Sequence, residues 1–173
     1  RSLPIVKKEL DAFLEAKVPQ VKFVDRTFNC NRQRAIDIWS YLVEHDNGIT
    51  NFHFEISSDL LGEEELELFA KMRPGLIQLE IGVQSTNGET VDAIHRHMDL
   101  DKLFHYVDRV HELGNIHQHL DLIAGLPYEN YERFGCSFDD LYAHEPDQLQ
   151  LGFLKVLKGT MMEEEVKKYS ILY

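Results

Sequence analysis

The sequence predicts an α/β fold in which parallel strands alternate with helices and curl into a partial barrel. Five short strand-like stretches each lead into a helical pattern, which is typical of parallel strands joined by right-handed crossovers. These strands carry apolar side chains on one face and polar side chains on the other, whereas strands covered by helices on both faces would be apolar on both. One face therefore meets helices, and the other lines a polar interior that could hold a ligand.

The chain opens with an amphipathic helix, expected at residues 3–16. Its apolar face consists of Leu3, Val6, Leu10, Phe13 and Leu14. The sequence starts at Arg1, and no strand precedes the helix. We therefore expect this helix to belong to a β/α unit whose strand is missing from this chain.

The remaining elements follow without a linker or low-complexity segment. Strands are expected at residues 20–25, 51–57, 76–83, 117–124 and 148–156, and further helices at 31–44, 62–72, 87–94, 99–113, 130–142 and 161–169. Asp99 is expected to cap the helix that Gly114 ends. We expect a single truncated domain over residues 1–173, with the first helix at 3–16, the β/α units at about 20–160 and a C-terminal helix and tail at 161–173.

Alternation of side chains identifies the two faces of the sheet. The polar face is expected to consist of His53, Glu55, Ser57, Gln78, Glu80, Gly82, Gln84, His117, His119, Asp121, Gln148 and Gln150. The residues between them are mostly apolar. An antiparallel sheet with one face in solvent is the alternative, but it would not need a helix between every pair of strands. We therefore favour the barrel.

Composition excludes several classes of protein. The chain has 173 residues, 43% of them hydrophobic and 28% charged, with a net charge of −12. This charge disfavours general binding to nucleic acid or anionic membranes. No apolar run reaches membrane-spanning length and no signal-peptide pattern opens the chain, so the cytoplasm is the expected compartment. Two cysteines are too few for a disulfide framework or a structural zinc site.

Four short segments, each at the end of a predicted strand, carry a family resemblance. They are Val-Asp-Arg-Thr-Phe at 24–28, Ile-Gly-Val-Gln-Ser at 81–85, Asp-Leu-Ile-Ala-Gly-Leu-Pro at 121–127 and Leu-Lys-Gly-Thr at 157–160. Together with Arg96, they resemble the S-adenosylmethionine (SAM)-binding barrel of radical SAM enzymes such as oxygen-independent coproporphyrinogen dehydrogenase and the tRNA methylthiotransferases. The resemblance implies a partial TIM-like (β/α)6 barrel whose first strand is missing from this chain.

The resemblance also implies a SAM site at the carboxyl ends of the strands, where ligands of α/β barrels bind. Glu55 would accept hydrogen bonds from the SAM amino group. Arg96 would pair with the SAM carboxylate, a role that suits its bidentate guanidinium. Gln84 and Asp121 would hold the ribose hydroxyls. Without the resemblance, Arg96 would be read as a surface arginine near a helix end and Asp121 as the cap of a turn.

Three more residues complete the expected SAM site. Ser85 follows Gln84 in the second segment of the resemblance. The backbone around Ile123 and Gly125 would lie along the adenine, where glycine permits close approach. The stretch at 154–160 resembles the subgroup that carries a cobalamin-binding domain ahead of the barrel, whose members are often labelled magnesium-protoporphyrin monomethyl ester cyclase-like.

The family's chemistry needs a [4Fe-4S] cluster held by three cysteines in a C-x3-C-x2-C loop, with SAM on the open iron position. Cleavage of SAM then gives a 5′-deoxyadenosyl radical that abstracts a substrate hydrogen atom. This chain has only Cys30, expected in a loop, and Cys136, expected to be buried in a helix. We therefore expect a fragment of an oxidoreductase whose intact form binds SAM, the cluster and, in the cobalamin subgroup, cobalamin. The fragment alone is expected to be catalytically silent, to carry no cofactor and to bind SAM weakly at best. A barrel that has lost its cluster is the alternative.

Other readings of the sequence remain open. His117, His119 and Asp121 share a strand face and would suit a metal-dependent hydrolase, although the histidines lie toward the amino-terminal end of the strand. A non-catalytic binding module would use the apolar tail at 169–173. A missing first strand would leave the strand at 20–25 with an unpaired edge, so we also expect self-association. The substrate is not indicated by these residues.

Overall fold

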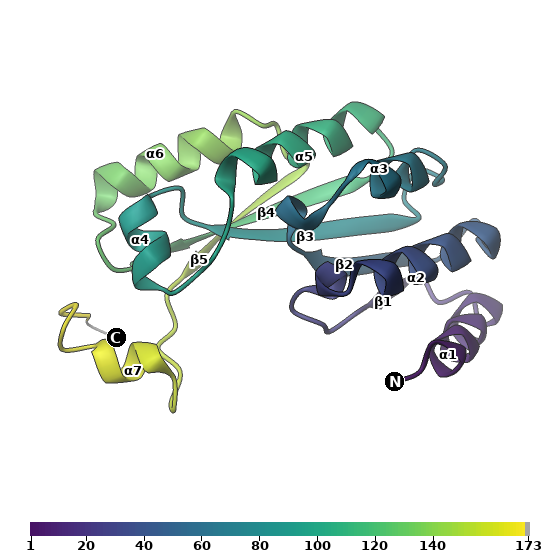
Figure 1. Cartoon of the computed structure of the whole chain (residues 1–173), viewed down its shortest axis with the longest axis horizontal. Coiled ribbons are helices and arrows are strands. Elements are labelled where there is room, and N and C mark those ends of the chain that lie inside the picture. Colours follow the sequence, from purple (N-terminus) through teal and green to yellow (C-terminus); the bar gives the residue numbers. More distant parts are fainter. Residues whose placement is uncertain (172–173) are drawn as a thin grey trace.

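Five parallel strands lie side by side in chain order in the computed structural model, which describes residues 1–171. The strands are β1 (Gln20–Lys22), β2 (Asn51–Ile56), β3 (Ile77–Gln84), β4 (His117–Ala124) and β5 (Gln148–Phe153). The helices are α1 (Leu3–Glu15), α2 (Arg32–Glu44), α3 (Glu63–Phe69), α4 (Gly88–Ala93), α5 (Leu100–Leu113), α6 (Tyr131–Tyr142) and α7 (Met161–Glu165). Figure 1 shows α3, α5 and α6 along one face of the sheet, with α1 and α7 beyond its two ends. The predicted α/β half-barrel of parallel strands is confirmed.

The ends of α5 follow signals that the sequence carries. The side chain of Asp99 accepts a hydrogen bond of 3.0 Å from the backbone N–H of Lys102. At the other end, Gly114 takes a left-handed φ of +67°, which glycine adopts without the steric cost of a β-carbon. The cap and the stop are where the sequence predicts them. None of the helices within residues 1–171 is long and apolar enough to cross a membrane.

Three elements end early where packing partners are missing, and α3 also ends early, at Phe69 instead of residue 72. β1 ends at Lys22 instead of residue 25, β5 at Phe153 instead of 156, and α7 at Glu165 instead of 169. Packing that would extend them is missing, since Val24 is 90% exposed, Phe153 is 80% exposed and α7 has no buried residue. Regular structure in proteins depends largely on such packing. Part of the tail expected as an apolar patch, residues 172–173, lies outside the described residues.

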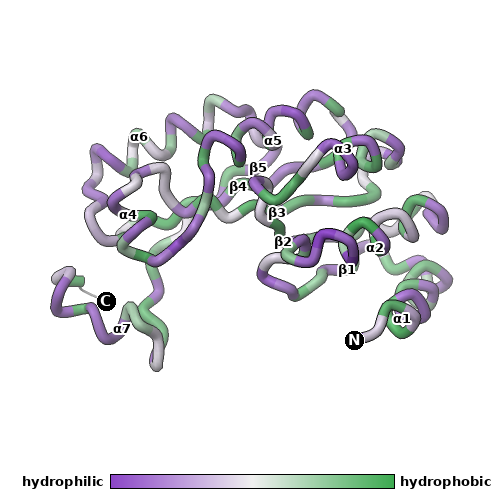
Figure 2. The backbone as a smooth tube through the Cα atoms, in the orientation of Figure 1, coloured by the Kyte–Doolittle hydropathy of each residue, from purple (hydrophilic) through white to green (hydrophobic). Residues whose placement is uncertain are grey.

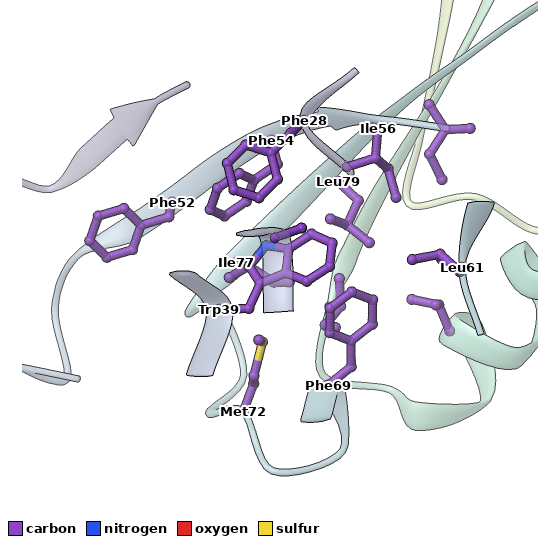
Figure 3. Close-up of a cluster of buried hydrophobic side chains, with 14 of the residues drawn as sticks. Phe28, Trp39, Phe52, Phe54, Ile56, Leu61, Phe69, Met72, Ile77 and Leu79 are labelled. Atoms are coloured by element: carbon purple, nitrogen blue, oxygen red, sulfur yellow. The ribbon is translucent and has the colours of Figure 1, made fainter. Parts of the chain in front are cut away.

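The apolar face of the sheet packs against the helices around a cluster of aromatic rings (Figure 3). The ring centroid of Phe54 on β2 lies 4.5 Å from that of Phe23 and 4.4 Å from that of Phe28. Trp39 from α2 meets Phe54 edge-on at 5.9 Å and Phe69 at 5.0 Å. In Figure 2 the hydrophobic stretches run along the central strands. This core holds β2 and β3 in place, and their other face carries the polar side chains.

We call that other face, opposite α3, α5 and α6, the inner face. Strand register places Glu55 of β2 beside Glu80 of β3, and Glu80 beside His119 of β4. One step further toward the carboxyl ends, Gly82 lies beside Asp121. The polar row predicted from alternation is therefore continuous across three strands.

The two cysteines lie apart on the surface. Both Cys30 and Cys136 are exposed free thiols. The prediction that Cys136 is buried is wrong, because α6 buries the next residue, Ser137, and Leu141 instead.

Candidate functional site

Three of the residues expected to bind SAM line one cavity at the carboxyl ends of β2 and β3. Its volume is about 460 Å³, and its lining consists of Arg26, Thr27, Glu55, Ile56, Ser57, Gly82, Gln84 and Arg96. Glu55 and Gln84 come from strand ends, whereas Arg96 comes from the turn after α4. An acceptor for an ammonium group and a guanidinium for a carboxylate therefore meet in one space.

A bulge at the end of β3 aims Gln84 into this cavity. The register between β3 and β4 shifts between Gly82 and Gln84, and Gln84 takes a left-handed φ of +73°. Such a φ is uncommon for a residue with a β-carbon, and bulges re-aim side chains near functional sites. The Gln84 amide packs directly over Gly82, where a β-carbon would fall well inside van der Waals contact with Gln84 Nε2. Only glycine at position 82 leaves room for this arrangement.

Arg96 is held at the same point. Its guanidinium donates a hydrogen bond to the carbonyl oxygen of Gly82. Burial lowers the pKa of Arg96, while the carboxylates of Asp59 and Glu55 act in the opposite sense. Burial, and then the charge of Glu80, raises the pKa of Glu55. The cavity thus holds a partly desolvated cation and anion, whose interactions with a charged ligand are stronger than in water.

Asp121 of β4 lies beside Gly82, one of the residues that line the cavity. Burial, together with the charges of Glu80 and Glu55, raises its pKa to about 7. Its Oδ1 atom is buried and has no hydrogen-bond partner, and the same is true of Gln84 Oε1. Buried acceptors of this kind are rare in isolation. Two unpaired acceptors on neighbouring strands fit a ligand that presents hydroxyl donors, as the ribose of SAM does.

The raised pKa of Asp121 predicts a pH-dependent stability. The folded state keeps this proton up to about pH 7, whereas the unfolded chain releases it near its ordinary value of 3.8. The free energy of unfolding is therefore highest below about pH 3.8 with respect to this group. It falls as the pH rises from there toward 7, by about 4 kcal/mol at most. We expect Asp121→Asn to remove this loss. Denaturant unfolding should then show that the stability of the variant relative to the wild type is larger at about pH 8 than at about pH 5. Asp101→Asn, on the exposed side of α5, is the control; an equal difference at both pH values would contradict the prediction.

The remaining expected site residues lie elsewhere. Ser85 is buried, and its hydroxyl donates to Glu129 Oε1 at 2.5 Å, away from the cavity. Ile123 pairs with Gly152 on β5. Gly125, with a φ of +88°, lines a separate cavity of about 660 Å³ next to α6 and Tyr169. The structure therefore brings Glu55, Gln84 and Arg96 together, with Asp121 close by. Ser85, Ile123 and Gly125 lie outside that cavity.

Metal ligands do not converge in the described part of the chain. Residues 1–171 contain no group of three or more His, Cys, Asp or Glu side chains placed to hold a metal ion. His119 approaches Asp121, with 2.9 Å between Nε2 and Oδ1, but His117 does not complete a site with them. This geometry does not favour the hydrolase. Cys30 and Cys136 do not fit a [4Fe-4S] cluster either, because they lie on different elements and number two where three are needed.

Comparison with known families decides the assignment. The family model described as "Radical SAM superfamily" matches residues 1–141. The chain belongs to the radical SAM superfamily. The oxygen-independent coproporphyrinogen III oxidase of Salmonella typhimurium is 31% identical over 107 residues, which are 58% of this chain and 23% of that protein. The coproporphyrinogen-III oxidase-like protein HemZ of Bacillus subtilis is 29% identical over 115 residues, which are 65% of this chain and 22% of that protein.

Solved structures of radical SAM proteins share the fold. TsrM from Kitasatospora setae, a radical SAM methyltransferase solved with cobalamin and a [4Fe-4S] cluster, gives a TM-score of 0.83 at 17% identity and covers 97% of this chain. HemN from Escherichia coli gives 0.67 at 21% identity and covers 87%. This chain covers 34% and 38% of those two chains. The radical SAM chain described here thus corresponds to about a third of each structure.

Some residues that line the cavity were not assigned a role from the sequence. Arg26 lies in one of the four segments that carry the resemblance, and Gly82 lies on the predicted polar face. A glycine inside a strand signals a bulge or a close approach, so the role of Gly82 had a signal in the sequence. No signal placed Arg26 in the cavity, because that depends on how the loop after β1 folds.

Proposed function

We propose that this chain supplies the SAM-binding part of a radical SAM oxidoreductase. The observation that carries the proposal is the convergence of Glu55, Gln84 and Arg96 on one cavity beside Gly82. Glu55 accepts hydrogen bonds from the SAM ammonium group, and Arg96 pairs with the SAM carboxylate. Gln84 and Asp121, whose buried acceptors are unpaired, take the ribose hydroxyls. Their positions orient the methionine end and the ribose of SAM along the row of strand ends.

Ser85 supports this site indirectly in the proposal. Its buried hydroxyl also accepts from the backbone N–H of Asn87 at 3.0 Å, and Glu129 joins it to Ser137 of α6. This network fixes the chain directly after Gln84. The backbone of Ile123 and Gly125 continues the strand end toward the adenine.

The cluster is proposed to be held by residues outside 1–173. The stretches of this chain that match the two curated relatives named above cover only 23% and 22% of those proteins. When SAM is bound to such a cluster, it supplies the radical chemistry of the superfamily. A cobalamin-binding domain in the longer protein is part of this proposal, because residues 154–160 resemble that subgroup and TsrM contains cobalamin. The complete gene should encode three cysteines spaced C-x3-C-x2-C; a complete gene without them would contradict the oxidoreductase.

The role of Arg96 can be tested with two ligands that differ in one group. We expect Arg96→Gln to weaken binding of SAM by about tenfold, because a charge-assisted ion pair with the carboxylate is lost. Binding of decarboxylated SAM should not change. Arg109→Gln, which removes an exposed partner of Glu63 on the far side of the sheet, is the control. Equal losses for both ligands would show that Arg96 does not contact the carboxylate.

The free edge of β1 predicts self-association. The backbone N–H of Phe23 donates to His53, and the carbonyl of Pro19 accepts from Asn51, so Gln20 and Lys22 direct their backbone groups away from β2. Such an edge is a template for another chain. We expect the mass measured by light scattering to rise with concentration, and Gln20→Pro, which removes one outward N–H, to reduce the rise. A strictly monomeric wild type at high concentration would contradict this.

A further inference from the structure

A second group of titratable side chains lies on the inner face, on the amino-terminal side of the SAM cavity. We call it the Glu80 cluster: Lys22, His53, Glu80, His119 and Asp121. Lys22 Nζ lies 2.6 Å from Glu80 Oε2, and His53 Nε2 lies 2.8 Å from the same oxygen. His119, whose Cα is in register with that of Glu80, places its Nε2 2.9 Å from Asp121 Oδ1. Apart from Asp121, none of these residues has a role in the SAM site.

The cluster is incompletely paired. Both contacts of Glu80 fall on Oε2, and Oε1 accepts none of the hydrogen bonds formed within residues 1–171. The imidazoles of His53 and His119 approach their carboxylates but are not aligned for a hydrogen bond, so the buried Nε2 of each has no partner. The His119 side chain is only 7% exposed. Since buried polar groups are nearly always satisfied, these atoms point to a ligand that completes them.

The charges of the cluster select the kind of ligand. Burial lowers the pKa of both His53 and His119, so these rings are neutral near pH 7. Burial opposes ionisation of Glu80, but the hydrogen bond and charge of Lys22 outweigh it and lower the Glu80 pKa. The amine of Lys22 is already paired with Glu80. A carboxylate brought here would meet two carboxyl groups, whereas an N–H or O–H donor would meet acceptors.

We propose that the Glu80 cluster binds a hydrogen-bond donor of the substrate, such as an amine, amide or hydroxyl group, beside the ribose of SAM. Glu80 and Asp121 keep 14% and 15% of their side-chain surface exposed, so a ligand on the inner face can reach both. The inference rests on the proposed function, because SAM in the adjoining cavity brings the reacting atoms to this end of the inner face.

Nuclear magnetic resonance of the whole chain tests this with ethylammonium and propionate as matched probes, in the presence of EDTA. Ethylammonium should shift the ring signals of His53 and His119, and propionate should not. Glu80→Gln should weaken ethylammonium binding by about tenfold through loss of the charged acceptor. Glu67→Gln, an exposed change on α3, should not. Propionate shifts as large as those of ethylammonium, or unchanged binding in Glu80→Gln, would overturn the proposal.

Two further measurements distinguish a variant that does not fold from a wrong proposal, and one proposal from the other. If Glu80→Gln does not fold, which its backbone spectrum reveals, the comparison of the two probes on the wild type decides alone. A SAM titration of the same sample distinguishes the two proposals. Ethylammonium binding without SAM binding would count against the proposed function and leave the donor site standing, and SAM binding without ethylammonium binding would refute the donor site only.

Discussion

Replacing Phe54 with alanine is expected to lower the free energy of unfolding by about 4 kcal/mol, the usual range for a large aromatic side chain removed from a packed core. Phe54 is fully buried, and its ring contacts those of Phe23, Phe28 and Trp39. The cavity left behind would lie between β2 and α2, where rigid rings on several sides limit collapse. Denaturant unfolding measures the change.

Phe153→Ala is the matched control for this prediction. The same side chain is removed there from a site that is 80% exposed, so the loss should stay below about 1 kcal/mol. Equal losses in the two variants would mean that the aromatic cluster does not hold β2 in place. The position of Glu55, on the opposite face of the same strand, would then lack the support described above.

Gly82→Ala is expected to abolish most SAM binding while leaving the fold intact. A β-carbon at position 82 would displace the Gln84 amide, and it would come to 3.7 Å from the Arg96 guanidinium. The displaced atom is the end of a flexible side chain, so the cost in stability should be small, within about 1 kcal/mol. The loss of a positioned hydrogen-bonding group should weaken SAM binding by about tenfold or more.

Gly88→Ala is the control, because a β-carbon there meets no heavy atom within 4 Å. Both variants can be followed by SAM titration and by thermal unfolding. Unchanged SAM affinity in Gly82→Ala would show that Gln84 does not take part in binding. A large drop in melting temperature would instead show that position 82 serves the fold.

The fold could be predicted well because two kinds of sequence signal agreed: the alternation of side chains along the strands and the residues that begin and end a helix. The alternation of apolar and polar residues in β2, β3 and β4 fixed which face meets the helices, and Asp99 and Gly114 fixed the ends of α5. The shortened β1, β5 and α7 depend on packing partners, which local sequence does not reveal. The exposure of Cys136 has the same origin, since a helix position is buried only if something covers it.

The site was predictable in part. The resemblance gave Glu55, Gln84 and Arg96 as a set, and the structure brings them together. Two features of the site can be seen only in the structure. Gln84 has a left-handed backbone conformation that places its amide over Gly82, and the Ser85 side chain points toward Glu129. The unpaired acceptors of the Glu80 cluster depend on side-chain directions across three strands. No sequence pattern carries that information.

The most direct test of the central claim is a residue-resolved titration of this chain with SAM. If the inner-face cavity holds SAM, the backbone amide signals of Glu55, Gly82, Gln84 and Arg96 should shift together with one binding curve, and Asp121 should follow. If these signals stay fixed at saturating SAM, or if the shifts gather instead around Tyr128 and Tyr169 in the separate cavity, the assignment of the SAM site would be wrong.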